Sequence, residues 1–168
     1  DYKVTDDETF NQKEFLAKVK ASPECPKTAC PSPESFKEAF EGEAEYIFVV
    51  TLSNHLSGCY NSAALAKRLY EEEHGTDGKK IAVIDSLSAS AGELNIALFI
   101  RDLCEKELPF EEICRQTEAY RDSMNTYFVI ETLDFLKKNG RLTGLTAFIA
   151  SALNIKPVMG ADSGTIIK

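Results

Sequence analysis

Serine hydroxyls follow two apolar runs of the sequence, at places where the chain is expected to turn from a strand into a helix. Ser57 and Gly58 come shortly after the run 46–52, and Ser86 comes directly after the run 81–85. The free N–H groups and positive dipole end of a starting helix favour an anion, and Gly58 would let a ligand approach the backbone. Ser57 is equally well explained as a helix N-cap, and Ser86 as a turn partner. Anion binding and local capping both stay open.

A further group of donors lies in the proline-rich segment 21–31. There Thr28 precedes a helix start at Ser32-Pro33, which has the sequence of an N-cap followed by proline at the first helical position. Composition alone favours a solvated loop threonine at Thr28 over a ligand contact.

Nucleophilic catalysis is a second hypothesis for the same residues. Ser57 or Cys59 as nucleophile with His55 as base would give a small acyl-ester hydrolase. Side chains two residues apart on a turn rarely face each other, however, and the sequence has no G-x-S-x-G elbow. His55 is therefore expected to be a hydrogen-bonding loop residue.

Other chemistries lack a sequence signal. Neither the glycine-rich dinucleotide motif nor the P-loop motif is present. The five cysteines are an odd number without the two-residue spacing of zinc or redox motifs. We therefore expect no metal, no cofactor, and free thiols in a reducing cytoplasm.

Charge and hydropathy exclude two classes of partner. The 168 residues carry a net charge of −8 with no basic stretch interleaved with aromatics, so nucleic acid is not expected. The most apolar long segment, 89–104, contains Glu93, Arg101 and Asp102 and is too short to span a bilayer. It is expected to be a buried helix.

Alternating strands and helices must position the hydroxyls. The run 46–52 is continuously apolar, which indicates a strand covered on both faces and central in its sheet. A second buried strand is expected over 81–85, and the alternation predicts parallel strands in an open α/β sheet flanked by helices. The expected helices are 11–20, one from 33, 57–73, 89–104 and 110–122.

The last part of the sequence is less regular. We expect strands over 126–130 and 155–159, helices over 133–138 and 146–153, and a turn followed by another strand at the end. Pro157 favours an edge position for its strand. The chain begins on Asp1 without an initiator Met, so we expect a fragment with one domain over 1–124 and the beginning of a second over 125–168.

Several segments, taken in order, are similar to the DegV family of bacterial fatty-acid-binding proteins, and the similarity runs along nearly the whole chain. They are Lys27–Pro33, Leu56–Ala63, Val83–Ser86, Glu131–Arg141 and Leu153–Pro157.

The resemblance implies a two-domain protein that binds one long-chain fatty acid, with its tail in an apolar tunnel and its carboxylate near the domain junction. Some members are the non-catalytic binding subunit of fatty acid kinase, and a separate ATP-using subunit makes the acyl phosphate. The family's carboxylate contacts fall on Thr28 and Ser57. From their places in the two loops described above, we expect Gly58 and Ser86 to be supporting residues. For Thr28 the resemblance replaces the solvated-loop interpretation.

The sequence departs from the family pattern at several positions. Cys30 and Cys59 stand near the expected carboxylate site, where the family has glutamine and threonine, and they make its rim more apolar. The family's first strand and most of its second domain are absent, so a non-binding fragment that self-associates through an open sheet edge is a third hypothesis. The role of Arg141 stays open. Candidate tunnel residues, each equally well a core residue, are Phe128, Ile130, Leu133, Phe148 and Ile149.

Overall fold

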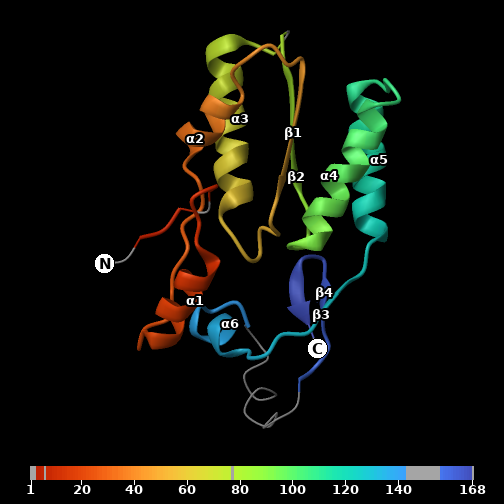
Figure 1. Ribbon diagram of the computed structural model, residues 1–168. Coiled ribbons are helices and arrows are strands. Elements are labelled where there is room, and N and C mark those ends of the chain that lie inside the picture. The colour runs from red at the N-terminus through yellow and green to blue at the C-terminus, as the bar shows by residue number, and fades with distance from the viewer. Residues whose placement is uncertain (1–2, 6, 77, 143–155, 168) are drawn as a thin grey trace.

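The computed structural model describes residues 3–5, 7–76, 78–142 and 156–167 of the chain (Figure 1). Its helices are α1 (Gln12–Ala21), α2 (Pro33–Ala39), α3 (Cys59–His74), α4 (Ala91–Cys104), α5 (Phe110–Ser123) and α6 (Asp134–Lys138). Its strands are β1 (Tyr46–Thr51), β2 (Lys80–Asp85), β3 (Thr126–Phe128), β4 (Met159–Asp162) and β5 (Thr165–Ile167).

Strands β1 and β2 are parallel and in register from Tyr46 opposite Lys80 to Thr51 opposite Asp85. Figure 1 shows α2 and α3 on one side of this pair and α4 and α5 on the other. Each face carries its own buried cluster, one around Phe40, Ala66, Tyr70 and Ile81 and one around Ile84, Ile96, Ile100, Leu103 and Ile113. The α/β class, the parallel pairing and the covering of both faces are confirmed.

The predicted central position of strand 46–52 is wrong for the residues that the structure describes. There β1 pairs with β2 alone, in a two-stranded sheet. A continuous apolar run reports that both faces of a strand are covered. It does not report how many strands lie beside it, because those neighbours bond to the backbone.

Local signals place the first two helices correctly. The Asn11 side chain accepts a hydrogen bond from the backbone N–H of Glu14, 3.1 Å away, at the start of α1. The Ser32 side chain accepts one from Ser35 at the start of α2, with Pro33 as the first helical residue. Each cap satisfies an N–H group that has no partner within its helix.

The last part of the chain forms a separate antiparallel sheet in the order β3-β4-β5. A third buried cluster lies against it, formed by Leu133, Leu142, Met159 and Ile166. The predicted strand over 155–159 is wrong in its described part, because residues 156–158 form no strand and β4 begins at Met159. Pro157 has no N–H to donate to a sheet. The predicted helix over 146–153 lies outside the described residues.

The expected final turn and strand are confirmed. Ser163 and Gly164 connect β4 to β5 with backbone φ angles of 48° and 81°. Two positive φ angles in succession are the geometry of the tight hairpin turn that matches the twist of its strands. All five cysteines are free thiols. Among the described helices, none has the length and apolar character needed to cross a membrane.

Candidate functional site

A cavity of about 600 Å³ lies between the segment that leads from β2 into α4, the end of α5 and the β3-β4-β5 sheet. Its volume is within the range of about 300–1,000 Å³ that is usual for small-molecule sites. None of the described residues that line it carries a charge. Its large apolar lining residues are Leu56, Leu87, Met124, Phe128, Ile130, Leu136 and Ile166.

The candidate tunnel residues divide between this cavity and the core. Phe128 and Ile130 line the cavity. Leu133 is buried in the third cluster, with 9% of its surface exposed, and it is not among the lining residues. Phe148 and Ile149 lie outside the described residues.

Ser57 stands beside the cavity, because Leu56, the residue before it, lines the wall. The Ser57 hydroxyl donates to Cys59 Sγ over 3.1 Å and accepts from the backbone N–H of Cys59 over 3.3 Å. Helix α3 therefore begins at Cys59, two residues later than predicted, with Gly58 rather than Ser57 at the N-cap position. A serine hydroxyl that bonds the backbone two residues on forms a turn in place of a helical start.

The proline-rich loop lies against this same helix start. The Ser62 hydroxyl donates to the Pro31 carbonyl over 2.7 Å, and Cys30 Sγ lies 3.4 Å from the position that a Cβ on Gly58 would occupy. Thr28 is exposed, two residues before Cys30. The structure thus brings the loop that carries Thr28 next to the turn that carries Ser57.

Ser86 is buried and acts as a turn partner. Its hydroxyl donates to the Ser88 carbonyl and accepts from the Ser88 backbone N–H, both over 3.1 Å. Ser88, a lining residue of the cavity, in turn shares a 2.8 Å hydrogen bond with the Thr126 hydroxyl of β3. Ser86 therefore shapes the loop that forms this part of the cavity wall.

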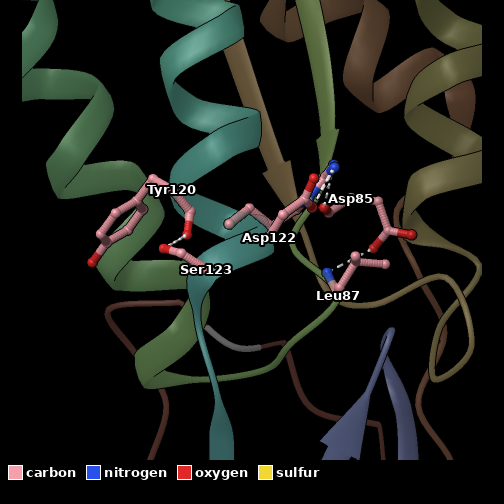
Figure 2. A network of polar contacts seen from close by, with 6 residues as sticks. Asp85, Leu87, Tyr120, Asp122 and Ser123 are labelled. Carbon is pink, nitrogen blue, oxygen red and sulfur yellow. Dashed lines mark hydrogen bonds and ion pairs between the residues drawn. The ribbon is translucent and has the colours of Figure 1, made fainter.

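Two buried polar residues that the sequence analysis did not single out tie the site together. The Ser53 hydroxyl donates to the Gly164 carbonyl over 2.8 Å and accepts from the His55 backbone N–H. Asp85 Oδ1 accepts from the backbone N–H groups of Asn54 and Leu87 (Figure 2 shows the Leu87 contact). Their positions in the sequence could have indicated a role at the site, since Ser53 follows the apolar run 46–52 and Asp85 ends the run 81–85.

The structure also places His55 and Arg141, and it bears on the question of a metal site. His55 is exposed, and no hydrogen bond of the described residues joins it to Ser57, whose hydroxyl faces Cys59. Arg141 donates to the carbonyl of Leu56 over 3.3 Å and to that of Asn139 over 2.6 Å. No group of three or more metal-ligating side chains gathers within the described ranges.

Glu93 is a partly buried carboxylate that directly follows the lining residue Gly92. Burial raises the pKa of Glu93, and a hydrogen bond from the Ser90 backbone N–H opposes the rise. That bond, over 3.0 Å, occupies Glu93 at the start of α4. An uncharged, largely apolar wall remains for a ligand.

Comparison with known proteins gives consistent matches. A family model described as "Uncharacterised protein, DegV family" matches residues 1–168. A curated DegV domain-containing protein of Streptococcus pneumoniae is 40% identical over 168 residues, which are 99% of this chain and 58% of that protein. The chain therefore spans a little over half the length of such relatives.

Two solved structures show what similar proteins hold. A DegV family protein from Ruminococcus gnavus, refined with vaccenic acid, is 51% identical with a TM-score of 0.93, over 99% of this chain and 59% of that one. The fatty acid kinase B3 protein of Streptococcus pneumoniae, loaded with linoleic acid, is 40% identical with a TM-score of 0.85, over 96% of this chain and 57% of that one.

Proposed function

The chain belongs to the DegV family, and we propose that it binds one long-chain fatty acid, with the carboxylate at the start of α3 and the acyl chain in the apolar cavity. The observation that carries the proposal is that the start of α3 adjoins the apolar cavity. Leu56 lines the cavity, and the next residue, Ser57, presents a hydroxyl beside a helix N-terminus. The fatty acids in the two solved relatives support the same ligand class.

The head-group site is formed by Ser57 and Thr28, with Gly58 between the helix start and the proline-rich loop. In the structure the Ser57 hydroxyl donates to the sulfur of Cys59, and sulfur is a weak acceptor. A carboxylate is a far better acceptor, so the hydroxyl can turn to it with little loss. Each charge-assisted hydrogen bond would contribute about 1.5–3 kcal/mol. Ser86 supports the site through the shape of its loop.

The acyl chain supplies the larger share of the affinity. Each methylene removed from water contributes about 0.8 kcal/mol. The cavity wall offers Phe128, Ile130 and Leu136 to such a chain. Affinity is therefore expected to rise with acyl length until the cavity is filled.

The first test is to denature the purified chain, extract it with organic solvent and identify the extract by mass spectrometry. About one long-chain fatty acid per chain supports the proposal. If none co-purifies, the chain is titrated with oleic acid, and absence of saturable binding contradicts it.

The second test addresses the head group. Ser57→Ala and Thr28→Val are each expected to weaken fatty-acid binding by about 1–3 kcal/mol with little loss of stability, because each removes a donor to the carboxylate. Thr9→Ala, which removes an exposed hydroxyl that donates to Asp7 and is not among the cavity-lining residues, is the control and should bind as the unchanged chain does. Normal affinity in both site variants contradicts the carboxylate assignment.

We further infer that the bound acid is presented to a separate ATP-using kinase subunit, so that this chain is a non-catalytic partner. The likeness to the fatty acid kinase B3 protein of Streptococcus pneumoniae supports the inference. All five cysteines are free thiols, which suits a reducing cytoplasm. Acyl phosphate should form when the kinase subunit, ATP and the loaded chain are mixed, and omission of the chain should abolish it.

The same proposal places a domain boundary between residues 124 and 125, with one domain over 1–124 and part of a second over 125–168. The change from the parallel pair β1-β2 to the antiparallel sheet that begins with Thr126 supports this division. Because the cavity is lined from both sides of that boundary, the ligand would lie at the junction of the two domains.

A further inference from the structure

Asp85 is the last residue of β2, and only 8% of its surface is exposed. Asp85 is not among the residues that line the cavity. We propose that Asp85 is a positioning residue, which holds the head-group turn and the cavity wall in the relative arrangement that a fatty acid needs. This inference rests on the proposed function and names the residue that links the proposed head-group site to the proposed acyl-chain cavity.

A single oxygen of Asp85 makes the link. Asp85 Oδ1 accepts a hydrogen bond from the Asn54 backbone N–H over 3.2 Å and from the Leu87 backbone N–H over 3.1 Å. Figure 2 shows Asp85 at the end of its strand with Leu87 beside it. Asn54 and Leu87 belong to the segments that follow different strands. Bonds from backbone N–H groups to a carboxylate are charge-assisted and are stronger than those to a neutral acceptor.

The Asn54 contact reaches the head-group site. Asn54 follows Ser53, whose carbonyl accepts from the backbone N–H groups of Leu56 over 2.9 Å and Ser57 over 3.0 Å. Residues 53–57 therefore form one hydrogen-bonded turn. An acceptor that fixes Asn54 also fixes the direction in which this turn presents Ser57.

The Leu87 contact reaches the cavity. Leu87 lines it and has a backbone φ of 51°, a left-handed conformation that a leucine seldom adopts. The bond from Asp85 to the N–H two residues on is an Asx-turn, which supports such a bend. The position of Leu87 also matters to the hairpin, because a Cβ on Gly164 would lie 3.2 Å from Leu87 Cα.

The two segments have other connections that do not use the Asp85 side chain. The Ser86 N–H donates to the Thr51 carbonyl over 3.1 Å, and the Ser53 N–H to the Ser88 carbonyl over 2.9 Å. Arg121 Nη1 donates to the Asp85 main-chain carbonyl over 3.4 Å. Removing the carboxylate therefore leaves the sheet and the backbone ladder in place and releases the amides of Asn54 and Leu87.

The test compares oleic acid with oleyl alcohol, which has the same tail and no carboxylate, in competition for the 168-residue chain. In Asp85→Ala the affinity for the acid should fall about tenfold or more, about 1.4 kcal/mol, and the ratio of acid to alcohol affinity should fall toward one. In Asp85→Asn, whose amide oxygen is a weaker acceptor at the same place, the ratio should fall about threefold. A merely structural role would lower both affinities together.

Thr117→Val is the control, because it changes a fully buried side chain of α5 that is not among the residues lining the cavity. It should keep the acid-to-alcohol ratio of the unchanged chain. A folded Asp85→Ala variant that keeps this ratio overturns the role of Asp85. If that variant does not fold, an unchanged ratio in Asp85→Asn overturns it. An unchanged chain that binds neither ligand overturns the proposed function instead.

Discussion

Two regions of the molecule use their apolar residues differently. The layered region, residues 33–123, covers both faces of β1 and β2, and Ile96 and Ile113 have 0% and 1% of their surfaces exposed. The tail region, residues 126–142 and 156–167, directs one part of its apolar surface to a cavity and exposes another. Val129 is 53% exposed and Val158 is 62% exposed. Close packing favours stability, whereas incomplete packing leaves room for a ligand.

The largest effect is expected in the layered region. Ile96→Ala should lower the free energy of unfolding by about 2–5 kcal/mol, because the side chain is fully enclosed by the cluster of Ile84, Ile100 and Leu103. Urea unfolding measures this loss. Phe128→Ala, at the cavity wall of the tail region, is the matched comparison.

Phe128 packs against the third cluster and faces the cavity on another side. Its truncation should reduce fatty-acid affinity more than stability, since part of its surface already lacks protein neighbours. If Phe128→Ala destabilises the chain as much as Ile96→Ala and leaves affinity unchanged, the contrast between the regions does not hold.

Enlarged side chains should also distinguish the two regions, because only the tail region has space for added atoms. Ala66 is fully buried between α3 and the sheet, so Ala66→Leu should destabilise the chain by about 1–3 kcal/mol through overpacking. Ala161 lines the cavity, so Ala161→Leu has space for its new atoms. It should keep stability and weaken binding of the longest fatty acids most. Thermal unfolding and a chain-length series measure the two effects, and equal destabilisation in both variants would contradict the difference.

The elements of the layered region were largely predictable because their signals are local. Ser32 caps the first helix of this region and accepts a hydrogen bond from an amide only three residues away, and the apolar runs of β1 and β2 are continuous. The tail region was harder. Its cavity residues Phe128 and Ile130 have the same apolar pattern as the buried Leu133, so spacing cannot distinguish a wall from a core.

Some residues of the candidate site were also predictable from the sequence, and others were not. The position of Ser57 after a buried strand follows from the general rule for parallel sheets, whereas Thr28 came from family resemblance alone. Ser53 and Asp85 were missed because their partners are distant. Ser53 bonds a residue 111 positions away, and Asp85 bonds one 31 positions away. A single sequence does not show which distant residues come into contact. The carboxylate contacts themselves stay a prediction.

A smaller effect is expected where the two regions meet. Gly164 has a φ of 81°, and a Cβ there would lie 2.4 Å from Ser53 Oγ. Gly164→Ala should therefore displace the β4-β5 hairpin from Ser53 and weaken ligand binding, in addition to a conformational loss of about 1–2 kcal/mol. Gly75→Ala is the control, since Gly75 has a φ of 78° and nothing within 4 Å of the added Cβ. It should lose stability alone. Equal ligand affinity in both variants would contradict a role for hairpin docking.

The smallest effect is expected on the solvent face of the layered region. Hydrogen bonds from Arg115 and Gln116 lower the pKa of Glu112 from 4.5 to about 2. Because the folded-state pKa lies below the ordinary value, the stabilisation is complete above pH 4.5 and is lost as the pH falls toward 2. Glu112 is exposed to solvent screening, so this loss should be slight beside that in Ile96→Ala. NMR titration of the Glu112 carboxyl should give a midpoint near 2 that rises in Arg115→Met and stays unchanged in Arg101→Met, whose partners are Asp102 and Glu105. A midpoint near 4.5 in the unchanged chain would show that this surface pair does not hold in solution.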